Sequence, residues 1–397
     1  MTTIINNEHK KLNVPNLRFP EFQGEWEKCK LGDACNVLMC KRILASQTNT
    51  EGGVPFYKIG TIGGTPDSYI SKELFDDYKA KYNYPHKGDV MITCAGTVGK
   101  CVIYDGKDAY YQDSNIVWID NPSQHINNGF LYHFLANVDW RKLNSTTIIR
   151  IYNDDLRNLK LNYPQIEEQK KISHLLSLLD ERIATQNKVI EDLKKLKCAI
   201  IEEHYHQAEL HKYKVCDLGV PFSVGNLSKE DLSDEGSECV LYGELFTTYD
   251  GVINEIKSHT NKIANMTLSQ KGDLLFPSST TVDAISLISP SVIDVPNVVL
   301  GGDMFGIHID KNFNAYYISY YINIIARKKL AVYAKGSTII HLHYKDIAKA
   351  QFLLPDLNEQ DRIAKCIMAE DDKIKVEERI LIKLEIQKQY LLRQMFI

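Results

Sequence analysis

TIIRIYNDDLRNLKLNYP, residues 147–164, decides the fold of this chain, because it occurs a second time as TIIHLHYKDIAKAQFLLP at residues 338–355. The offset between the two copies is 191 residues, and no gap is needed to align them. The agreement continues beyond each proline, where Glu168-Gln169 corresponds to Glu359-Gln360. A duplication of this length predicts two modules of one kind.

The segments that follow the two prolines are expected to form long helices. Ile and Leu recur there at alternating steps of four and three residues, which is the period of a coiled-coil seam. Polar residues interrupt both stripes at matched positions, Gln186 with Glu377 and Lys197 with Lys388. Buried polar seam positions fix register and partner, so we expect the two helices to pair with each other. The predicted seam residues are Ile172, Leu176, Leu179, Ile183, Ile190, Leu193, Ile363, Ile367, Ile374, Leu381, Leu384 and Leu391.

The duplication also predicts how the helices run. Two halves related by approximate two-fold symmetry would make the paired helices antiparallel. At 1.5 Å per residue, a helix of about 40 residues is roughly 60 Å long and can serve as a spacer. The predicted fold class is mixed α/β of the α+β type: two globular domains separated by an antiparallel coiled coil, with internal pseudo-two-fold symmetry. The expected boundaries are 1–163 for the first domain with an N-terminal arm, 164–208 for the first helix, 209–354 for the second domain and 355–397 for the second helix.

Composition narrows the class of protein. The chain has 397 residues, 44% of them hydrophobic, which is enough for two ordinary cores. Its net charge of −4 disfavours nucleic-acid binding by bulk charge, although a local basic face is still allowed. No apolar run could span a membrane and the stretch from Met1 to Lys11 is polar, so we expect a cytoplasmic protein without a signal peptide. The nine cysteines form no CxxC pair, which predicts free buried thiols.

Both globular regions carry the same landmarks. Lys87-Gly88-Asp89 and Lys271-Gly272-Asp273 each precede apolar residues, which predicts a turn entering a buried strand. An aromatic-rich piece that is expected to be helical follows in each, at 130–143 and 316–333. Between these landmarks the two sequences diverge strongly. A shared frame with unlike interiors predicts two modules that recognise different things.

The stretch Gly96-Thr97-Val98-Gly99-Lys100 resembles the end of a phosphate-binding loop. The match fails, because Cys94 stands where the first glycine should be and Cys101 stands where Ser or Thr should follow the lysine. We interpret it as a tight turn that exposes backbone amides and Lys100. Such a turn could hold a DNA phosphate, or it could be an ordinary hairpin turn with a solvated lysine.

No catalytic or metal-binding motif is found in the sequence. His204 with His206 and His341 with His343 form His-x-His pairs, but neither pair has the further ligands that a metal site needs. The nucleophile elbow, the zinc-protease motif, the dinucleotide loop and the methyltransferase tetrapeptides are all missing from the sequence. We therefore predict no catalytic residue, no metal ligand and no cofactor for this chain.

Several motifs together resemble those of the DNA-specificity subunit of type I restriction-modification systems. They are the opening Pro15-Asn16-Leu17-Arg18-Phe19-Pro20 with Gly24-Glu25-Trp26, the glycine turn at 96–100, and the two Pro-x-x-x-Glu-Gln-x-x-Ile helix starts at Pro164 and Pro355. The resemblance covers essentially the whole chain. The order of the motifs and the duplication make it more specific than any single motif.

The resemblance implies a function and a set of partners. Two target recognition domains would each read one half of a bipartite, asymmetric site in double-stranded DNA. The paired helices would set the spacing between the halves and dock two modification subunits, which transfer a methyl group from S-adenosylmethionine to adenine. ATP-driven translocation and cleavage, with their ATP and Mg, would belong to restriction subunits. The chain itself would be a non-catalytic specificity subunit that needs no membrane.

Polar or glycine-rich loops are the expected location of the side chains that contact DNA. The candidates are Lys58, Thr61, Thr97, Lys100, Arg150, Ser278, Ser279, Thr280, Lys335, Ser337 and His341. Two other hypotheses stay open. An intrinsic methyltransferase or nuclease would act on DNA without partners, and a duplicated coiled-coil scaffold that binds only proteins would give an assembled complex no sequence preference.

Overall fold

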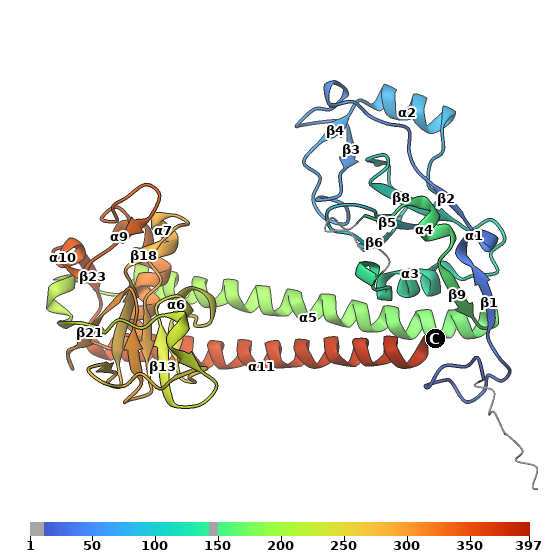
Figure 1. Cartoon of the computed structure of the whole chain (residues 1–397). Helices are drawn as coiled ribbons and strands as arrows, with labels where there is room; N and C mark the ends of the chain where they lie inside the picture. Colours follow the sequence, from blue (N-terminus) through green and yellow to red (C-terminus); the bar gives the residue numbers. More distant parts are fainter. Residues whose placement is uncertain (1–11, 143–149) are drawn as a thin grey trace, which may run out of the picture. The chain divides into compact units, whose positions relative to one another are not determined.

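The computed structural model describes residues 12–142 and 150–397 and divides the chain into two compact units. The first unit comprises Met1–Asn187 with Ile380–Ile397, and the second comprises Lys188–Arg379 (Figure 1). Each unit contains one globular region and a part of each long helix. The start of the repeated stretch, Thr147-Ile148-Ile149, lies outside the described residues, as does the N-terminal stretch 1–11.

The two long helices predicted after the prolines are confirmed. Helix α5 is Ile166–Gln207 and helix α11 is Leu357–Met395. The Glu-Gln motif near each helix start has a structural explanation. The buried side-chain amides of Gln169 and Gln360 donate to the carbonyls of Pro164 and Pro355, both at 2.8 Å. These bonds occupy backbone acceptors that precede each helix, so they fix the direction in which the chain enters it.

The same glutamines tie each long helix to its globular region. The Gln169 side-chain oxygen accepts from the backbone N–H of Asn127 at 2.7 Å, and that of Gln360 accepts from Asn314 at 3.0 Å. Asn127 and Asn314 are the N-caps of helices α3 (Asn128–Asn137) and α8 (Ala315–Tyr321). The two units therefore repeat these two hydrogen bonds at the junction between helix and globular region.

The helices run antiparallel within each unit, as predicted. In the first unit Leu392 and Met395, near the end of α11, pack in one cluster with Ile172, near the start of α5. In the second unit Ile201, near the end of α5, packs with Ile363, near the start of α11. In each unit the late part of one helix therefore lies against the early part of the other.

The two lysines that interrupt the apolar stripes, Lys197 and Lys388, each form an ion pair with an aspartate of the other long helix. Lys197 Nζ lies 2.7 Å from an Asp371 carboxylate oxygen, and the lysine is only 7% exposed. Lys388 pairs in the same way with Asp180 in the first unit. Burial lowers the pKa of Lys197, but the charges of Asp250 and Asp371 outweigh burial, so its pKa is raised and the lysine stays charged.

Each of these aspartates also faces a side chain from its globular region. The Tyr320 hydroxyl donates to Asp371 at 2.7 Å. At the matching place in the first unit, His133 Nδ1 lies 3.9 Å from Asp180, and burial lowers the pKa of this histidine to about 4. The imidazole is therefore neutral near pH 7. In each unit, one aspartate of a long helix thus contacts a lysine of the other long helix and a side chain of the globular region.

Most of the predicted seam is buried. Only Ile183, Leu381 and Leu391 are half-buried. At the last position the neighbouring Leu392 is the buried residue, and it matches Ile201 in the other copy. The 3.6-residue turn of an α-helix drifts from the 3.5-residue seam, which explains this shift by one residue. The buried seam residues are Ile172, Leu176, Leu179, Ile190, Leu193, Ile363, Ile367, Ile374 and Leu384.

The globular region of the first unit is built on three sheets. Their strand orders are β2-β8-β5-β6, β4-β3-β7 and β1-β9. Its helices are α1 (Leu31–Ala34), α2 (Lys72–Lys81), α3 and α4 (Asn153–Arg157), with 3-10 turns at Ala45–Gln47 and Trp140–Lys142. Its strands are β1 (Glu27–Lys30), β2 (Asn36–Leu38), β3 (Val54–Tyr57), β4 (Tyr69–Ile70), β5 (Val90–Thr93), β6 (Cys101–Ile103), β7 (Tyr110–Tyr111), β8 (Ile116–Asp120) and β9 (Lys160–Tyr163).

The second unit has two larger sheets, β11-β21-β17-β19-β14 and β12-β15-β13-β20-β16, and the pairs β10-β23 and β18-β22. Besides α8, its globular helices are α6 (Glu244–Thr247), α7 (Ala284–Leu287), α9 (Arg327–Ala331) and α10 (Tyr344–Ile347), with a π-helix at Ile322–Ala326 and 3-10 turns at Val215–Asp217 and Lys229–Asp231. Its strands are β10 (His211–Lys214), β11 (Gly219–Ser223), β12 (Leu232–Ser233), β13 (Ser237–Leu241), β14 (Val252–Ile253), β15 (Ser258–Thr260), β16 (Thr267–Leu268), β17 (Asp273–Pro277), β18 (Ser279–Thr280), β19 (Ser291–Ile293), β20 (Val299–Gly301), β21 (Met304–Ile309), β22 (Ile340–His341) and β23 (Gln351–Leu354).

A common frame underlies these different sheets. Strands β1 and β9 pair antiparallel in the first unit just as β10 and β23 do in the second. The Lys-Gly-Asp turns lead into the fully buried strands β5 and β17, which confirms that prediction. The aromatic-rich pieces are helical, although the second is interrupted by the π-helix and Leu143 of the first lies outside the described residues. Among the described residues, no helix has both the length and the apolarity needed to cross a bilayer.

The Lys197–Asp371 ion pair gives a test of the helix junction. We expect Lys197→Ala to lower the free energy of unfolding by about 3 kcal/mol, because it leaves a mostly buried carboxylate without its ammonium partner. Urea denaturation of the purified chain measures this loss. The control is Lys195→Ala, which removes an exposed ion pair with Glu191 and should lower the free energy of unfolding far less. Equal losses in the two variants would contradict a structural role for the buried pair.

Candidate nucleic-acid interface

The candidate contact residues of the first module come together around the glycine turn that joins β5 to β6. The Cys94 N–H donates to the Asn115 carbonyl at 2.7 Å, and the Cys94 carbonyl accepts from the Ile151 N–H at 2.9 Å. Arg150 therefore lies beside the turn, and its guanidinium donates to the Ser114 carbonyl at 3.2 Å. Thr97 is exposed within the turn. Residues distant in sequence thus form one surface, which we call the first loop cluster: 58–64, 94–100, 113–115 and 150–152.

Lys100 has a structural contact that the sequence did not predict. Its ammonium donates to the Ile62 carbonyl at 2.5 Å and so ties the glycine turn to the loop at 58–64. Lys58 and Thr61 lie in that loop, where the Thr61 hydroxyl accepts from the Lys58 N–H at 3.0 Å. Lys58 also pairs with Asp67 at 2.9 Å. Lys100 is therefore not simply a solvated lysine, because it uses one of its three donors to position a neighbouring loop.

Packing defines the shape of the glycine turn. Gly99 has a φ of +83°, and a Cβ there would lie 2.2 Å from the indole ring of Trp140. Gly96 also has a positive φ, of +65°, and faces the end of the Ile59 side chain. The glycines are thus needed for backbone conformation and close packing against Trp140, which is buried. The two glycines of this turn are therefore explained by packing, and no bound phosphate is needed to account for them.

The second module uses the equivalent region differently. Where the first copy has its glycine turn, Asp283 caps helix α7, accepting from the Ser286 N–H at 2.8 Å. The candidates of this module gather on the short β18-β22 ribbon, in which Ser279 pairs with His341 and Thr280 with Ile340. The hairpin that contains Ser337 closes on this ribbon through the bridge between Lys335 and His341.

Two of these candidates are poorly placed to touch a ligand. Ser278 and Ser279 are only 3% and 9% exposed. The Ser278 carbonyl instead accepts from the Leu342 N–H at 2.9 Å. The sequence analysis chose these serines because they lie in a polar segment that was expected to be a loop, but backbone bonds to the segment at 341–342 hold them in buried positions. Thr280 is half-buried, and His341, Lys335 and Ser337 are the more exposed members of the group.

A polar groove lies beside the ribbon. It has a volume of about 570 Å³ and is lined by Lys335, His341, His343 and Lys345, together with Asp303, Gly336 and Asp346. A second hollow of about 500 Å³ shares Asp303, His343 and Lys345. Lys335 donates to Asp346 at 2.5 Å, and this bond holds the pKa of that carboxyl below its usual range. The groove thus brings two lysines, two carboxylates and two imidazoles together, so its lining is polar with no net formal charge when the imidazoles are neutral.

His343 and Lys345 were missed as contact candidates. The sequence contained a signal for His343, since it forms a His-x-His pair with His341. Lys345 had no such signal, because it belongs to α10 and only the packing of that helix brings it to the groove. Nearby backbone contacts, rather than any motif, decide which side chains share this groove.

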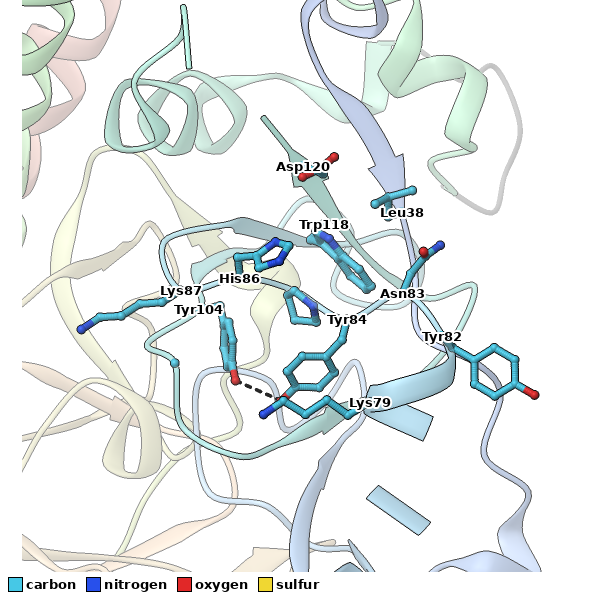
Figure 2. A pocket seen from close by; sticks show the side chains of 12 residues that line it. Leu38, Lys79, Tyr82, Asn83, Tyr84, His86, Lys87, Tyr104, Trp118 and Asp120 are labelled. Carbon is cyan, nitrogen blue, oxygen red and sulfur yellow. Dashed lines mark hydrogen bonds between the residues drawn. The ribbon is translucent and has the colours of Figure 1, made fainter. Parts of the chain in front are cut away.

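The first module has a pocket away from its loop cluster. Figure 2 shows Tyr84 and Tyr104 joined through their hydroxyls, which are 3.0 Å apart, and His86 and Asp120 also line the pocket. The ligand atoms of His86, Asp89 and Asp120 lie within 4.8 Å of one another, the one such group found in the described residues. Burial raises the pKa of Asp89. These residues could hold a metal ion, a possibility that the sequence analysis missed because it depends on the pairing of β5 with β8.

All nine cysteines are free thiols, as predicted, but they are not all buried. Cys216 and Cys366 are exposed, contrary to the expectation. Burial raises the pKa of Cys94 to about 11 and that of Cys40 to about 12. Near pH 7 these two thiols stay protonated, so they are poor nucleophiles.

Comparison with known proteins follows the two-module division. The family described as the type I restriction modification DNA specificity domain matches residues 23–195 and 226–386. Part of the chain, 164 residues or 41%, is 49% identical to a putative type I restriction enzyme specificity subunit of Haemophilus influenzae, and this match covers 42% of that relative. Nearly the whole chain, 94%, is 24% identical to the putative MjaX specificity subunit of Methanocaldococcus jannaschii, covering 92% of it.

Solved structures share the fold. The S subunit of a type I restriction-modification system from M. genitalium matches with a TM-score of 0.61 at 16% identity, over 97% of this chain and 99% of that one. A chain from a structure concerned with assembly and conformational transition of the type I R-M system matches with a TM-score of 0.52 at 15% identity, over 92% and 96%.

The fold and the two loop surfaces define a protein with two recognition modules on a pair of long helices. The family match covers most of the chain and falls on both modules. The chain belongs to the type I restriction-modification DNA specificity family, as its motifs suggested.

The contact between Gly99 and Trp140 gives a test of the first loop cluster. We expect Gly99→Ala to destabilise the chain by about 3 kcal/mol, through both the positive φ and the clash with the indole ring. Thermal unfolding monitored by calorimetry measures the loss. Gly24→Ala is the matched control, because Gly24 also has a positive φ but has no atom within 4 Å of the added Cβ. It should cost only about 1 kcal/mol, and an equal loss in both would show that the indole contact is unimportant.

Proposed function

We propose that this chain selects the DNA site of a type I restriction-modification complex, with one module reading each half of a bipartite, asymmetric sequence. The proposal rests on one observation: the two modules share backbone hydrogen bonds at matched positions but expose different side chains there. The backbone bond from Ile151 to Cys94 recurs as the bond from Leu342 to Ser278, both at 2.9 Å. The exposed groups on these frames differ, so the half-sites should differ as well.

The modules are proposed to comprise residues 1–163 and 209–354, with the spacer helices at 164–208 and 355–397. The contact residues proposed for the first module are Lys58, Thr61, Thr97, Lys100 and Arg150, and those for the second are Thr280, Lys335, Ser337 and His341. Arg and Lys can bind phosphates or guanine, and hydroxyl and imidazole groups can bind base edges. The polar groove supports this assignment in the second module, because Lys335 and His341 both line it. Ser278 and Ser279 are left out because they are buried.

The chain is proposed to act through partner subunits rather than by its own catalysis. Two modification subunits would dock on the helix pair and transfer the methyl group from S-adenosylmethionine, and restriction subunits would use ATP and Mg for translocation and cleavage. The assembly would work on double-stranded DNA in the cytoplasm. The helix pair supports this role because its internal seam is already filled, and its outer faces are thus available to partners.

The function can be tested by mapping methylated adenines in a host with and without this chain, while its modification subunits are present. We expect methylation at one bipartite asymmetric motif to be lost when the chain is deleted and to return when it is restored. Single-molecule sequencing of the genome provides the readout. A host whose methylation is unchanged by the deletion, with the complex shown to be expressed, would favour the protein-scaffold hypothesis.

The spacer role has its own test. We propose to insert one heptad into each helix, after Lys188 and after Arg379, so that the apolar seam keeps its 3.5-residue period. Seven residues add about 10 Å, the rise of roughly three base pairs. The unread gap in the methylated motif should therefore lengthen by about three base pairs while both half-sites keep their sequences. An active complex with an unchanged gap would contradict the spacer role.

A further inference from the structure

Three-residue segments at matching positions of the two modules share one arrangement. The segments are Arg150-Ile151-Tyr152 and His341-Leu342-His343, which are 191 residues apart. Their central residues are buried, with Ile151 2% and Leu342 0% exposed. Since successive side chains of an extended chain point to opposite faces, the two outer residues of each segment project away from the core. Tyr152 is 60% exposed, and both histidines are exposed.

The backbone holds both segments in the same way. Upstream, the Ile151 and Leu342 N–H groups donate to the carbonyls of Cys94 and Ser278. Downstream, the carboxylates of Asp155 and Asp346 accept from the N–H groups of Tyr152 at 2.8 Å and His343 at 3.2 Å. Each segment is thus fixed on both sides by hydrogen bonds. A fixed backbone presents its outer side chains with little loss of conformational entropy when they bind, which suits a specific contact.

Within each segment the two outer side chains lie against each other. The Arg150 guanidinium sits over the Tyr152 ring, 5.8 Å from its centroid. In the second module the His341 and His343 rings are stacked, with centroids 6.2 Å apart and planes at 15°. Each pair thus places hydrogen-bonding groups beside a ring, with Arg150 half-buried and the other three side chains exposed. The frame is shared, but the chemistry differs: a guanidinium and a phenol in one module, and two imidazoles in the other.

We propose that these two pairs, Arg150 with Tyr152 and His341 with His343, are the side chains that set the base preference of each half-site. This assignment rests on the proposed function. Arg150 is suited to a bidentate contact with O6 and N7 of guanine, and its bond to the Ser114 carbonyl orients the guanidinium. An imidazole offers one donor and one acceptor when neutral, so the histidine pair suits a base edge that presents both. Tyr152 and His343 support the reading side chains by stacking.

The assignment also explains the sequence divergence at these positions. Identical backbone bonds and buried central residues keep the segment in place, and the outer positions can change without loss of the fold. The groove that His341 and His343 line also contains Lys345, whose ammonium could bind a phosphate beside the base that is read.

The test uses the full complex of this chain with its modification subunits and a library of duplexes in which each half-site base is varied singly. Initial methylation rates are compared for the wild type, Arg150→Ala and the double variant His341→Ala/His343→Ala. We expect Arg150→Ala to lose its preference at one or two positions of one half-site, by about 5- to 150-fold, the effect of one good base contact. The histidine variant should lose preference in the other half-site only.

Two controls separate base reading from charge and folding. Arg157→Ala removes an exposed arginine of the first module, and His211→Ala removes an exposed histidine of the second, and both should keep the wild-type preferences. Arg150→Lys keeps the charge but loses the planar fork, so it should also lose the base preference. Its thermal unfolding profile should match that of the wild type.

Several outcomes would overturn the assignment. A rate that falls equally on every duplex would mean that these side chains bind phosphate, and preferences that stay unchanged would mean that other residues read the bases. Either result, obtained with a wild-type complex that is sequence-specific, leaves the proposed function standing. A wild-type complex without any sequence preference would overturn the proposed function itself.

Discussion

A buried glutamine at the start of each long helix is the constraint on which the rest of the structure depends. Gln169 and Gln360 each bind the carbonyl of the proline that precedes the helix and the N-cap residue of a globular helix. A buried side-chain amide has few alternative partners, and leaving it unpaired would cost about 1–3 kcal/mol. The direction of each long helix relative to its own globular region is therefore fixed at its first turn.

The ion pairs between the helices extend this constraint. Asp180 and Asp371 each accept a lysine from the opposite helix and face a side chain of the globular region. Because a charge in the seam is costly unless its partner is opposite, each pair restricts the register of the two helices within its own unit. A globular region that is held on the long helices in this way can vary in the sequence of its exposed loops while its buried strands and helices stay in place. The two units illustrate this, since they share hydrogen bonds at matched positions and differ in their sheets.

The sequence was sufficient for the parts of the fold that repeat or that have a period. The two long helices and the entry turns of β5 and β17 were predicted correctly, and most of the expected seam residues are buried. The candidate contacts were predicted less completely. Lys100 was identified as a loop residue, but its bond to the Ile62 carbonyl joins residues 38 positions apart and leaves no local pattern. Ser278 and Ser279 were chosen for polarity, and the pairing of β18 with β22 buries them.

The sequence by itself determined that this chain is a duplicated protein with paired helices, because periodicity and repetition are properties of the residues in order. Only the tertiary structure decided which loops meet. Arg150 reaches Ser114, and Lys335 reaches Asp346, through strands and turns whose pairing depends on distant backbone groups. Side-chain type can be read along the chain, but the surface that a set of side chains forms depends on long-range hydrogen bonding and packing, which have no fixed spacing in sequence.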